Sequence, residues 1–437
     1  MLRSLSILLF VLATLPMAFV EPFVGLLLWV LFSYMNPYRE AYGFAYGFRW
    51  VLIIAAVTLF SMLINRSKVQ RIEWTPLVSL LLFFLIATGI SSLFAVMPDI
   101  AVDKWIQLFK VQIMVFATLM LVNDRKRMHW MVWVIVLSFG LWAVKGGLFT
   151  LIKGGAYHVY GPGKSFYGDN NQFALVMCMT LPLMRYLQVQ ARARWLRTAL
   201  WVLMALTVLS ILGTYSRGGL ITLLAVLVLL VLRGRKRFGI LIVVLMAAPL
   251  VFNFLPQHWK TRMAGLSSGH AEKSESFEGR LQSWEFATNV ALHRPLTGGG
   301  FGVWASSEMW STYGPPGAVQ RAIHSIWFQV LGEQGFVGLL FFVSLLILGW
   351  RNLSVVKRRA RDDPQKHWLQ DLAGFMQVSM VAYVVSGSAL PQAYFDFIYQ
   401  LLALTVLLRR FAESPATVTA ADRAPAAARG VVRAVGR

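Results

Sequence analysis

Charged residues are scarce in this sequence, and acidic residues are the scarcest. Only 14% of the 437 residues are charged, whereas soluble domains carry about 25%. Lys and Arg number 41 against 19 Asp and Glu, so the formal net charge is +22. Cys178 is the only cysteine, which excludes a disulfide framework and a metal site built from several cysteines. Hydrophobic residues take the place of the missing charge and make up 57% of the chain.

Long apolar runs recur from one end of the chain to the other. Runs of this length suit helices that cross a bilayer, so the sequence predicts an all-α polytopic membrane protein with about 12 spans. The first run, after Arg3, resembles a signal peptide but leads directly into a second run, so we expect an uncleaved span. The runs lie near residues 5–20, 22–35, 50–64, 76–96, 108–122, 128–152, 170–187, 196–214, 217–232, 238–254, 324–350, 370–390 and 393–408.

The positive charge is concentrated in short connectors that lie two spans apart. This spacing is typical of the positive-inside rule, so we expect these connectors on the cytoplasmic side and no nucleic acid as a partner. If the first two runs form one bent crossing, there are about 12 spans and both termini lie inside; if both cross, there are about 13. The charge at Arg3 and the short second run favour the bent crossing. The basic connectors lie at 66–71, 125–127, 192–197, 233–237 and 351–361.

By parity, the other connectors face outward, and one of them is long and polar. The predicted organisation is a transmembrane bundle at 1–254, a large outward loop with amphipathic helices at 255–323, further spans at 324–410, and a disordered basic tail at 411–437. A long loop held between spans is where function is usually displayed. We find neither a His-Glu-x-x-His motif nor an outward Asp-x-Asp pair, so we expect no metal and no cofactor.

Two arginines and a histidine stand out on the predicted outer face. Arg217 lies between two spans that have almost no connector, where positive-inside statistics do not favour it. Arg280 lies on a predicted amphipathic helix whose apolar face contains Leu281, Trp284, Phe286, Ala287 and Val290. His324 begins the next span and is suited to act as a general base. The alternatives without a function are that Arg217 is a snorkelling arginine, that Arg280 is an ordinary solvated charge, and that His324 is an interfacial histidine.

Weaker candidates accompany these three residues. Arg321 would lie one helical turn before His324 and hold its imidazole neutral. Lys164 and Asn170 are candidates for contacting a headgroup or sugar on the same face. The segment around Lys164 is similar to the end of a P-loop, but His158 stands where the first glycine is needed and the segment faces outward, so we reject a nucleotide site.

With these residues in view, the chain resembles the O-antigen ligase family, which also includes O-antigen polymerases and protein O-oligosaccharyltransferases. The features that carry the resemblance span about residues 165–345: Ser216-Arg217-Gly218-Gly219, Gly279-Arg280-x-x-x-Trp284, Pro295-x-x-Gly298-x-Gly300, and His324 followed by Glu333-x-Gly335. The N-terminal third, with Trp29 to Pro37 and Gly43 to Tyr46, resembles exosortase-associated O-glycosylation ligases.

The resemblance implies a glycosyltransferase C-type fold in the bacterial inner membrane, with an active site that faces the periplasm. It implies a glycan donor linked to undecaprenyl pyrophosphate and a lipid A–core acceptor. The two arginines and the histidine of the family correspond to Arg217, Arg280 and His324. In the family the histidine is commonly followed by Asn, whereas Ser325 stands here. This difference leaves a polymerase or a protein-glycosylating ligase open as the alternative activity.

A transporter of lipid-linked glycans is the alternative from another class. It would bind the same pyrophosphate without chemistry, and more often shows internal repeats and charges near mid-membrane. The sequence indicates neither feature, so enzymatic transfer is the favoured interpretation.

Overall fold

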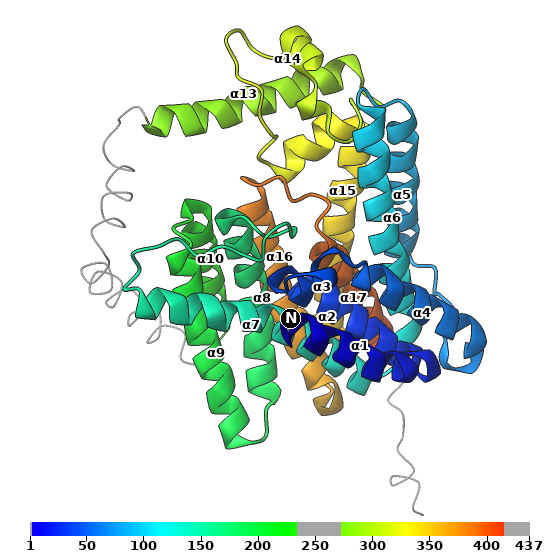
Figure 1. The fold of residues 1–437 in the computed structure, drawn as a ribbon. Helices are drawn as coiled ribbons and strands as arrows, with labels where there is room; N and C mark the ends of the chain where they lie inside the picture. The colour runs from blue at the N-terminus through cyan, green and yellow to red at the C-terminus, as the bar shows by residue number, and fades with distance from the viewer. Residues whose placement is uncertain (1, 234–271, 415–437) are drawn as a thin grey trace, which may run out of the picture.

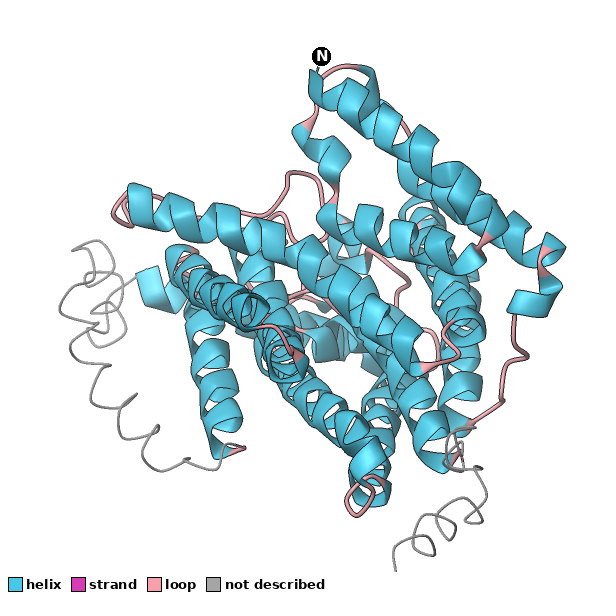
Figure 2. Ribbon diagram, turned by 90° about the horizontal axis from the view of Figure 1, so that it is seen from below, coloured by secondary structure: helices cyan, strands magenta, loops and turns pink. Residues whose placement is uncertain are grey.

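The computed structural model describes residues 2–233 and 272–414, where every regular element is a helix (Figures 1 and 2). The all-α prediction is confirmed there, while the run at 238–254, the start of the predicted loop and the tail after residue 414 lie outside the described residues. The helices are α1 (Leu2–Val20), α2 (Pro22–Met35), α3 (Phe44–Gly47), α4 (Trp50–Ile64), α5 (Pro76–Leu93), α6 (Pro98–Leu121), α7 (Arg125–Ile152), α8 (Asn170–Gln190), α9 (Arg194–Gly213), α10 (Arg217–Leu232), α13 (Glu272–His293), α14 (Ser307–Tyr313), α15 (Ile326–Arg359), α16 (His367–Gly387) and α17 (Asp396–Glu413).

Several of these helices are long and apolar enough to cross a membrane. Within the described ranges there are six of them, and α2, α4 and α10 are shorter apolar helices. The chain is therefore a polytopic membrane protein, as predicted, and the figure of about 12 spans stays a prediction. The six are α1, α5, α6, α7, α9 and α15.

α8 and α17 form the centre of the bundle. α8 packs against α7, α9, α10 and α16, and α17 packs against α5, α6, α15 and α16. Every side chain of α17 from Asp396 to Leu408 is buried. Hydrogen bonds between polar side chains join helices within this core; the amide of Gln400 on α17, for example, donates to the hydroxyl of Thr118 on α6 (2.9 Å).

α1 and α2 run in opposite directions and turn back on each other at Glu21. At one end of the pair, Arg3 donates a hydrogen bond to the carbonyl of Glu40, beyond the end of α2 (3.1 Å). At the other end, Lys68 donates to the carbonyl of Val20 (2.8 Å). The single bent crossing favoured by the sequence is therefore wrong, and the start of α1 lies beside the 36–49 connector.

The basic connectors gather at one end of the bundle, as the parity of the spans predicts. Three glutamates join basic residues of this end by ion pairs. The connectors at 125–127 and 192–197 line a common cavity through Arg125, Lys126 and Arg192. Pairing across connectors fixes which helix ends share a face. The ion pairs join Glu21 to Lys68 (3.1 Å) and Arg127 (3.1 Å), Glu73 to Arg410 (2.8 Å), and Glu413 to Arg359 (2.9 Å) and Arg409 (3.0 Å).

The opposite end carries α13 and α14, which lie across the tops of α5, α6 and α15 (Figure 1). The connectors predicted to face outward meet there. The amide of Val96, between α5 and α6, donates to the carbonyl of Gly299 (2.9 Å). Gln392 donates to the carbonyl of Phe166 (3.0 Å), which joins two further connectors of this group. We call this face the loop end of the bundle.

Candidate active site

α13 holds Arg280 at the loop end through its apolar face. Phe286 and Val290 are fully buried, and the helix packs against α14 and α15. The ring of Phe286 stacks on that of Trp310 with centroids 4.2 Å apart. The amphipathic helix is confirmed, and its apolar face contacts the protein core. Leu281 is 45% exposed and does not belong to this face, because five residues of α-helix turn it by about 140° from Phe286.

The glycine run after α13 docks into a break in α15. Gly335 has φ +68° and ψ −169°, a conformation open essentially to glycine alone. The break frees backbone groups of α15, and the loop satisfies them, which fixes the loop against the start of the helix. The amides donate from Gly299 to Gly332 (2.9 Å), from Gly300 to Glu333 (2.9 Å) and from Phe336 to Pro295 (2.8 Å).

His324 lies in the extended segment that leads into α15. The helix begins at Ile326, two residues after His324, so Arg321 does not lie one helical turn before the histidine, as it would if the helix had already begun. The indole of Trp284 on α13 donates to the carbonyl of His324 (3.3 Å). This bond holds the histidine backbone against the helix that carries Arg280. The imidazole itself is half-buried.

Arg321 reaches α13 by a different contact. Its guanidinium lies against Gly279, so closely that a Cβ built there would stand 1.4 Å from Nη1. Only a residue without a side chain leaves this space to the arginine. The glycine that precedes Arg280 therefore has a packing role, and it places a third cation beside the Arg280 and His324 pair.

Arg217 is presented by the three-residue turn between α9 and α10. Tyr215 has φ +55°, and the side chain of Ser216 caps α10 by accepting from the amide of Gly219 (3.0 Å). The Ser216 hydroxyl donates in turn to Asn171 at the start of α8 (2.7 Å). The turn that carries Arg217 is therefore fixed to α8, the central helix.

The charges of these elements act on one another. Burial lowers the pKa of Arg280, and the positive charge of Arg217 lowers it further. Burial also lowers the pKa of His324; Arg280 and Arg321 lower it further, while Asp169 raises it. The structure thus brings Arg217, Arg280 and His324 into one electrostatic cluster, with Arg321 and Asp169 at its edge. A neutral imidazole beside two guanidinium groups suits proton abstraction next to an anion.

Asn170 and Lys164, the weaker candidates, have other contacts. The amide of Asn170 donates to the carbonyl of Thr214 (2.8 Å), which fastens the Arg217 turn to α8. The ammonium of Lys164 lies over the ring of Tyr46 (5.6 Å). Among the described interactions, none joins Lys164 to the arginine and histidine cluster. Asp169 caps α8 and also acts on His324.

A cavity of about 310 Å³ opens beside the cluster. Ala322, two residues before His324, forms part of its wall, together with Lys104 and Glu333. The Glu333 carboxyl is buried, and one of its oxygens accepts from the amide of Gly302 (3.0 Å). The sequence marked Glu333 only as part of a motif. Glu333 lies in the cavity because α15 is broken two residues later, at Gly335. No local sequence pattern predicts this break.

Comparison with known families divides the chain in two. Residues 202–343 match the family described as O-antigen ligase, and residues 2–194 match a family of unknown function (DUF5935). No curated protein matches the chain. The first match contains Arg217, Arg280 and His324 together, and its family is of the glycosyltransferase type, acting in glycan transfer of the O-antigen ligase and polymerase kind. The chain is therefore a multi-pass membrane protein in which an O-antigen ligase domain follows an N-terminal domain of unknown function.

Proposed function

We propose that this protein transfers a glycan en bloc from undecaprenyl pyrophosphate to a sugar hydroxyl of lipid A–core. The observation that carries the proposal is the electrostatic cluster of Arg217, Arg280 and His324, supplied by three separate elements of an O-antigen ligase domain. Two guanidinium groups suit a pyrophosphate because their planar forks bind phosphate oxygens in pairs. The loop end of the bundle then faces the periplasm, and the basic end faces the cytoplasm of a bacterial inner membrane.

The proposed reaction is a single displacement with inversion at the anomeric carbon. His324 removes the proton of the acceptor hydroxyl while the acceptor oxygen bonds to the anomeric carbon. The bond from that carbon to the pyrophosphate oxygen breaks, and the leaving group departs with the electron pair. Arg217 and Arg280 stabilise its negative charge. The leaving group is already a good one, so base catalysis of the weak sugar nucleophile is the contribution that the chain most needs to supply.

The acceptor is the least constrained part of this proposal. A polymerase that extends a second lipid-linked glycan, or a ligase that glycosylates protein, would use the same donor and the same base. The sequence favours an enzyme over a transporter partly because it shows neither internal repeats nor charges near mid-membrane. The structure places Lys110 within α6 and Glu333 near the start of α15. The arrangement of His324 beside two arginines favours chemistry over transport, and activity decides between them.

The test is transfer by the purified, reconstituted protein. Undecaprenyl-pyrophosphate glycan and lipid A–core are the substrates, and a shift of the core band on a gel is the readout. We expect His324→Ala to lower the transfer rate by about 10²–10⁴, the usual contribution of a general base. His293→Ala is the matched control, because His293 ends α13 on the same face and is exposed. If the His324 variant instead moved the lipid-linked glycan across the membrane as fast as the wild type, the result would support a transporter.

Transfer should also persist in EDTA, because the proposed charge stabilisation comes from arginine side chains. The measurement is the initial transfer rate before and after chelation, with added Mg²⁺ or Mn²⁺ as the comparison. A rate that disappears on chelation and returns with the ion would contradict the assignment of Arg217 and Arg280 as the groups that hold the pyrophosphate.

A further inference from the structure

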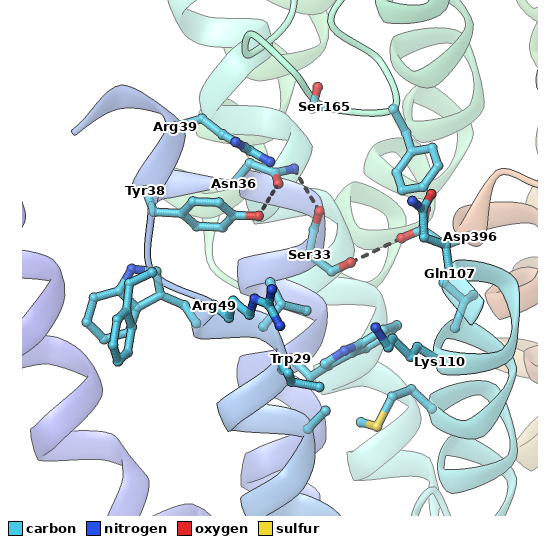
Figure 3. A pocket seen from close by; sticks show the side chains of 18 of the residues that line it. Trp29, Ser33, Asn36, Tyr38, Arg39, Arg49, Gln107, Lys110, Ser165 and Asp396 are labelled. Atoms are coloured by element: carbon cyan, nitrogen blue, oxygen red, sulfur yellow. Dashed lines mark hydrogen bonds between the residues drawn. The ribbon is translucent and has the colours of Figure 1, made fainter. Parts of the chain in front are cut away.

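A second cavity, of about 780 Å³, is lined by residues of the N-terminal domain of unknown function and by Asp396 of α17, and it shares no residue with the arginine and histidine cluster (Figure 3). It lies among α2, α4 and α6, with the connectors at 36–49 and 164–166 closing one side. Four of its lining residues are cations: Arg39, Arg49, Lys110 and Lys164. We call it the N-terminal cavity.

The charge of the N-terminal cavity is unbalanced. None of its four cations forms an ion pair with a described residue. Among the described lining residues, Asp396 is the one carboxylate; it accepts a hydrogen bond from Ser33 (3.1 Å), as Figure 3 shows. A site with four cations and one carboxylate favours a ligand with more than one negative charge.

Lys110 stands out among these cations because it lies within an apolar helix. It lies halfway along α6, twelve residues after Pro98 and eleven before Leu121, in a helix long and apolar enough to cross a membrane. An ammonium group at membrane depth is costly and normally marks a partner or a ligand. The described residues supply no acidic partner, so the cavity beside it is where an anion would be bound.

Aromatic rings hold two of the cations in place. The guanidinium of Arg39 lies 5.1 Å from the ring centre of Tyr38 and 5.6 Å from that of Tyr46. The ammonium of Lys164 lies 5.6 Å from the same Tyr46 ring. The Tyr38 hydroxyl is fixed by donating to Asn36 (3.1 Å) (Figure 3). Arg39 Nε is buried without a partner among the described residues, so this arginine retains an unused donor.

Another part of the lining is apolar and comes from α4 and α6. Leu52, Ala55 and Leu59 come from α4, and Val111 and Met114 come from α6. A free inorganic anion would leave this part of the cavity without an apolar partner. A ligand with a charged head and a hydrocarbon tail would contact both parts.

We propose that the N-terminal cavity binds a lipid whose headgroup carries a phosphate monoester or a diphosphate. Such a group has about two negative charges at neutral pH, and arginine forks bind its oxygens in pairs. The proposal stands apart from the transfer reaction. The N-terminal cavity shares Gln107, Val111, Ser165 and Phe166 with the cavity that contains Glu333, so a bound headgroup lies next to that cavity.

The experiment measures lipid binding to the purified full-length protein by native mass spectrometry. Phosphatidic acid, a phosphate monoester, is the probe; phosphatidylcholine and inorganic phosphate are the comparisons. We expect the wild type to bind phosphatidic acid at least about tenfold more tightly than either, and a combined Arg39→Gln, Lys110→Gln and Lys164→Gln variant to lose that preference. Lys145→Gln is the matched control, because this lysine of the loop end is paired with Glu40 (2.7 Å) outside the cavity.

A second variant tests the apolar part separately. Ala55→Trp narrows the tail region without changing charge, so it should weaken phosphatidic acid and leave inorganic phosphate unaffected. Equal binding of phosphatidic acid and phosphatidylcholine to the wild type would overturn the proposal, as would full binding in the triple variant. Inorganic phosphate that binds as tightly as the lipid, through the same three cations, would overturn the lipid assignment and leave a site for a soluble anion.

Discussion

A general base must be neutral to accept a proton, and the residues around His324 act on its charge in opposite senses. Burial, Arg280 and Arg321 lower the pKa of the imidazole, whereas Asp169 raises it. The folded-state pKa is lowered, so the ring is neutral above it and becomes protonated as the pH falls through it. The acid limb of the kcat/KM profile should therefore lie below about pH 6.5, the ordinary histidine value.

Two substitutions should move this acid limb in opposite directions. Arg321→Gln removes a positive charge, which raises the pKa of His324 and moves the limb to higher pH. Asp169→Asn removes a negative charge, which moves it to lower pH, and asparagine still caps α8. The measurement is kcat/KM for transfer between about pH 4 and 9, a range that spans the ordinary histidine pKa. Shifts of the same sign in both variants would count against His324 as the titrating base.

At this scale the sequence supplied the residues but not their contacts. Arg217, Arg280 and His324 stand out by their places on the predicted outer face, and the family resemblance supports them, but nothing in their spacing indicates that they lie together. The contact between Arg321 and Gly279 and the bond from Trp284 to the His324 carbonyl depend on how α13 packs against α15. Such packing follows from tertiary structure, which local periodicity does not contain.

At the scale of elements, hydropathy located the helices better than it located their ends. The run at 50–64 coincides with α4. The run at 108–122 captures only the second half of α6, which begins ten residues earlier at Pro98 and carries Asp99, Asp103 and Lys104 in this first part. α15 likewise continues through its basic connector to Arg359. A helix keeps its backbone hydrogen bonds in water or among headgroups, so it need not end where the apolar run does.

The break in α15 gives a prediction about stability. Gly335→Ala places a Cβ about 2.5 Å from the carbonyl oxygen of Pro295, on a backbone with φ +68°. We expect a cost of about 1–3 kcal/mol and a lower unfolding temperature in detergent. Gly163→Ala is the control, because nothing lies within 4 Å of the added methyl and its φ is ordinary. Equal unfolding temperatures for the two variants would show that the break is not constrained by the loop.

At the scale of the whole molecule, the two ends of the bundle differ in charge and in structure. One end collects the basic connectors and their glutamate partners, and the other collects the polar loop and the arginine and histidine cluster. The sequence predicted this division through the parity of its spans. It did not predict the antiparallel arrangement of α1 and α2. Two apolar runs joined at Glu21 have the same hydropathy pattern whether they form one bent helix or two antiparallel helices.

Orientation in the membrane is testable by labelling single cysteines. Cys178 is buried and is the only cysteine, so Cys178→Ala provides the background. In right-side-out vesicles, a membrane-impermeant maleimide should label Ser311→Cys in α14 and leave Asp362→Cys at the basic end unlabelled. Both positions are exposed. The reverse pattern would place the candidate active site in the cytoplasm and remove the periplasmic assignment.

The docking of the glycine run into α15 determines how homologous proteins can be recombined. In this protein the loop amides donate to the carbonyls of Gly332 and Glu333 at the break in α15. If the loop alone were exchanged, its amides would have to pair with the carbonyls of a helix break from another protein. A functional chimaera must therefore take residues 295–300 and 332–336 from the same parent protein, although the two segments are separate in the sequence. Chimaeras cut at 323, between the apparent loop and the apparent span, separate halves of one structure and are expected to fail in assembly before acceptor preference can be compared.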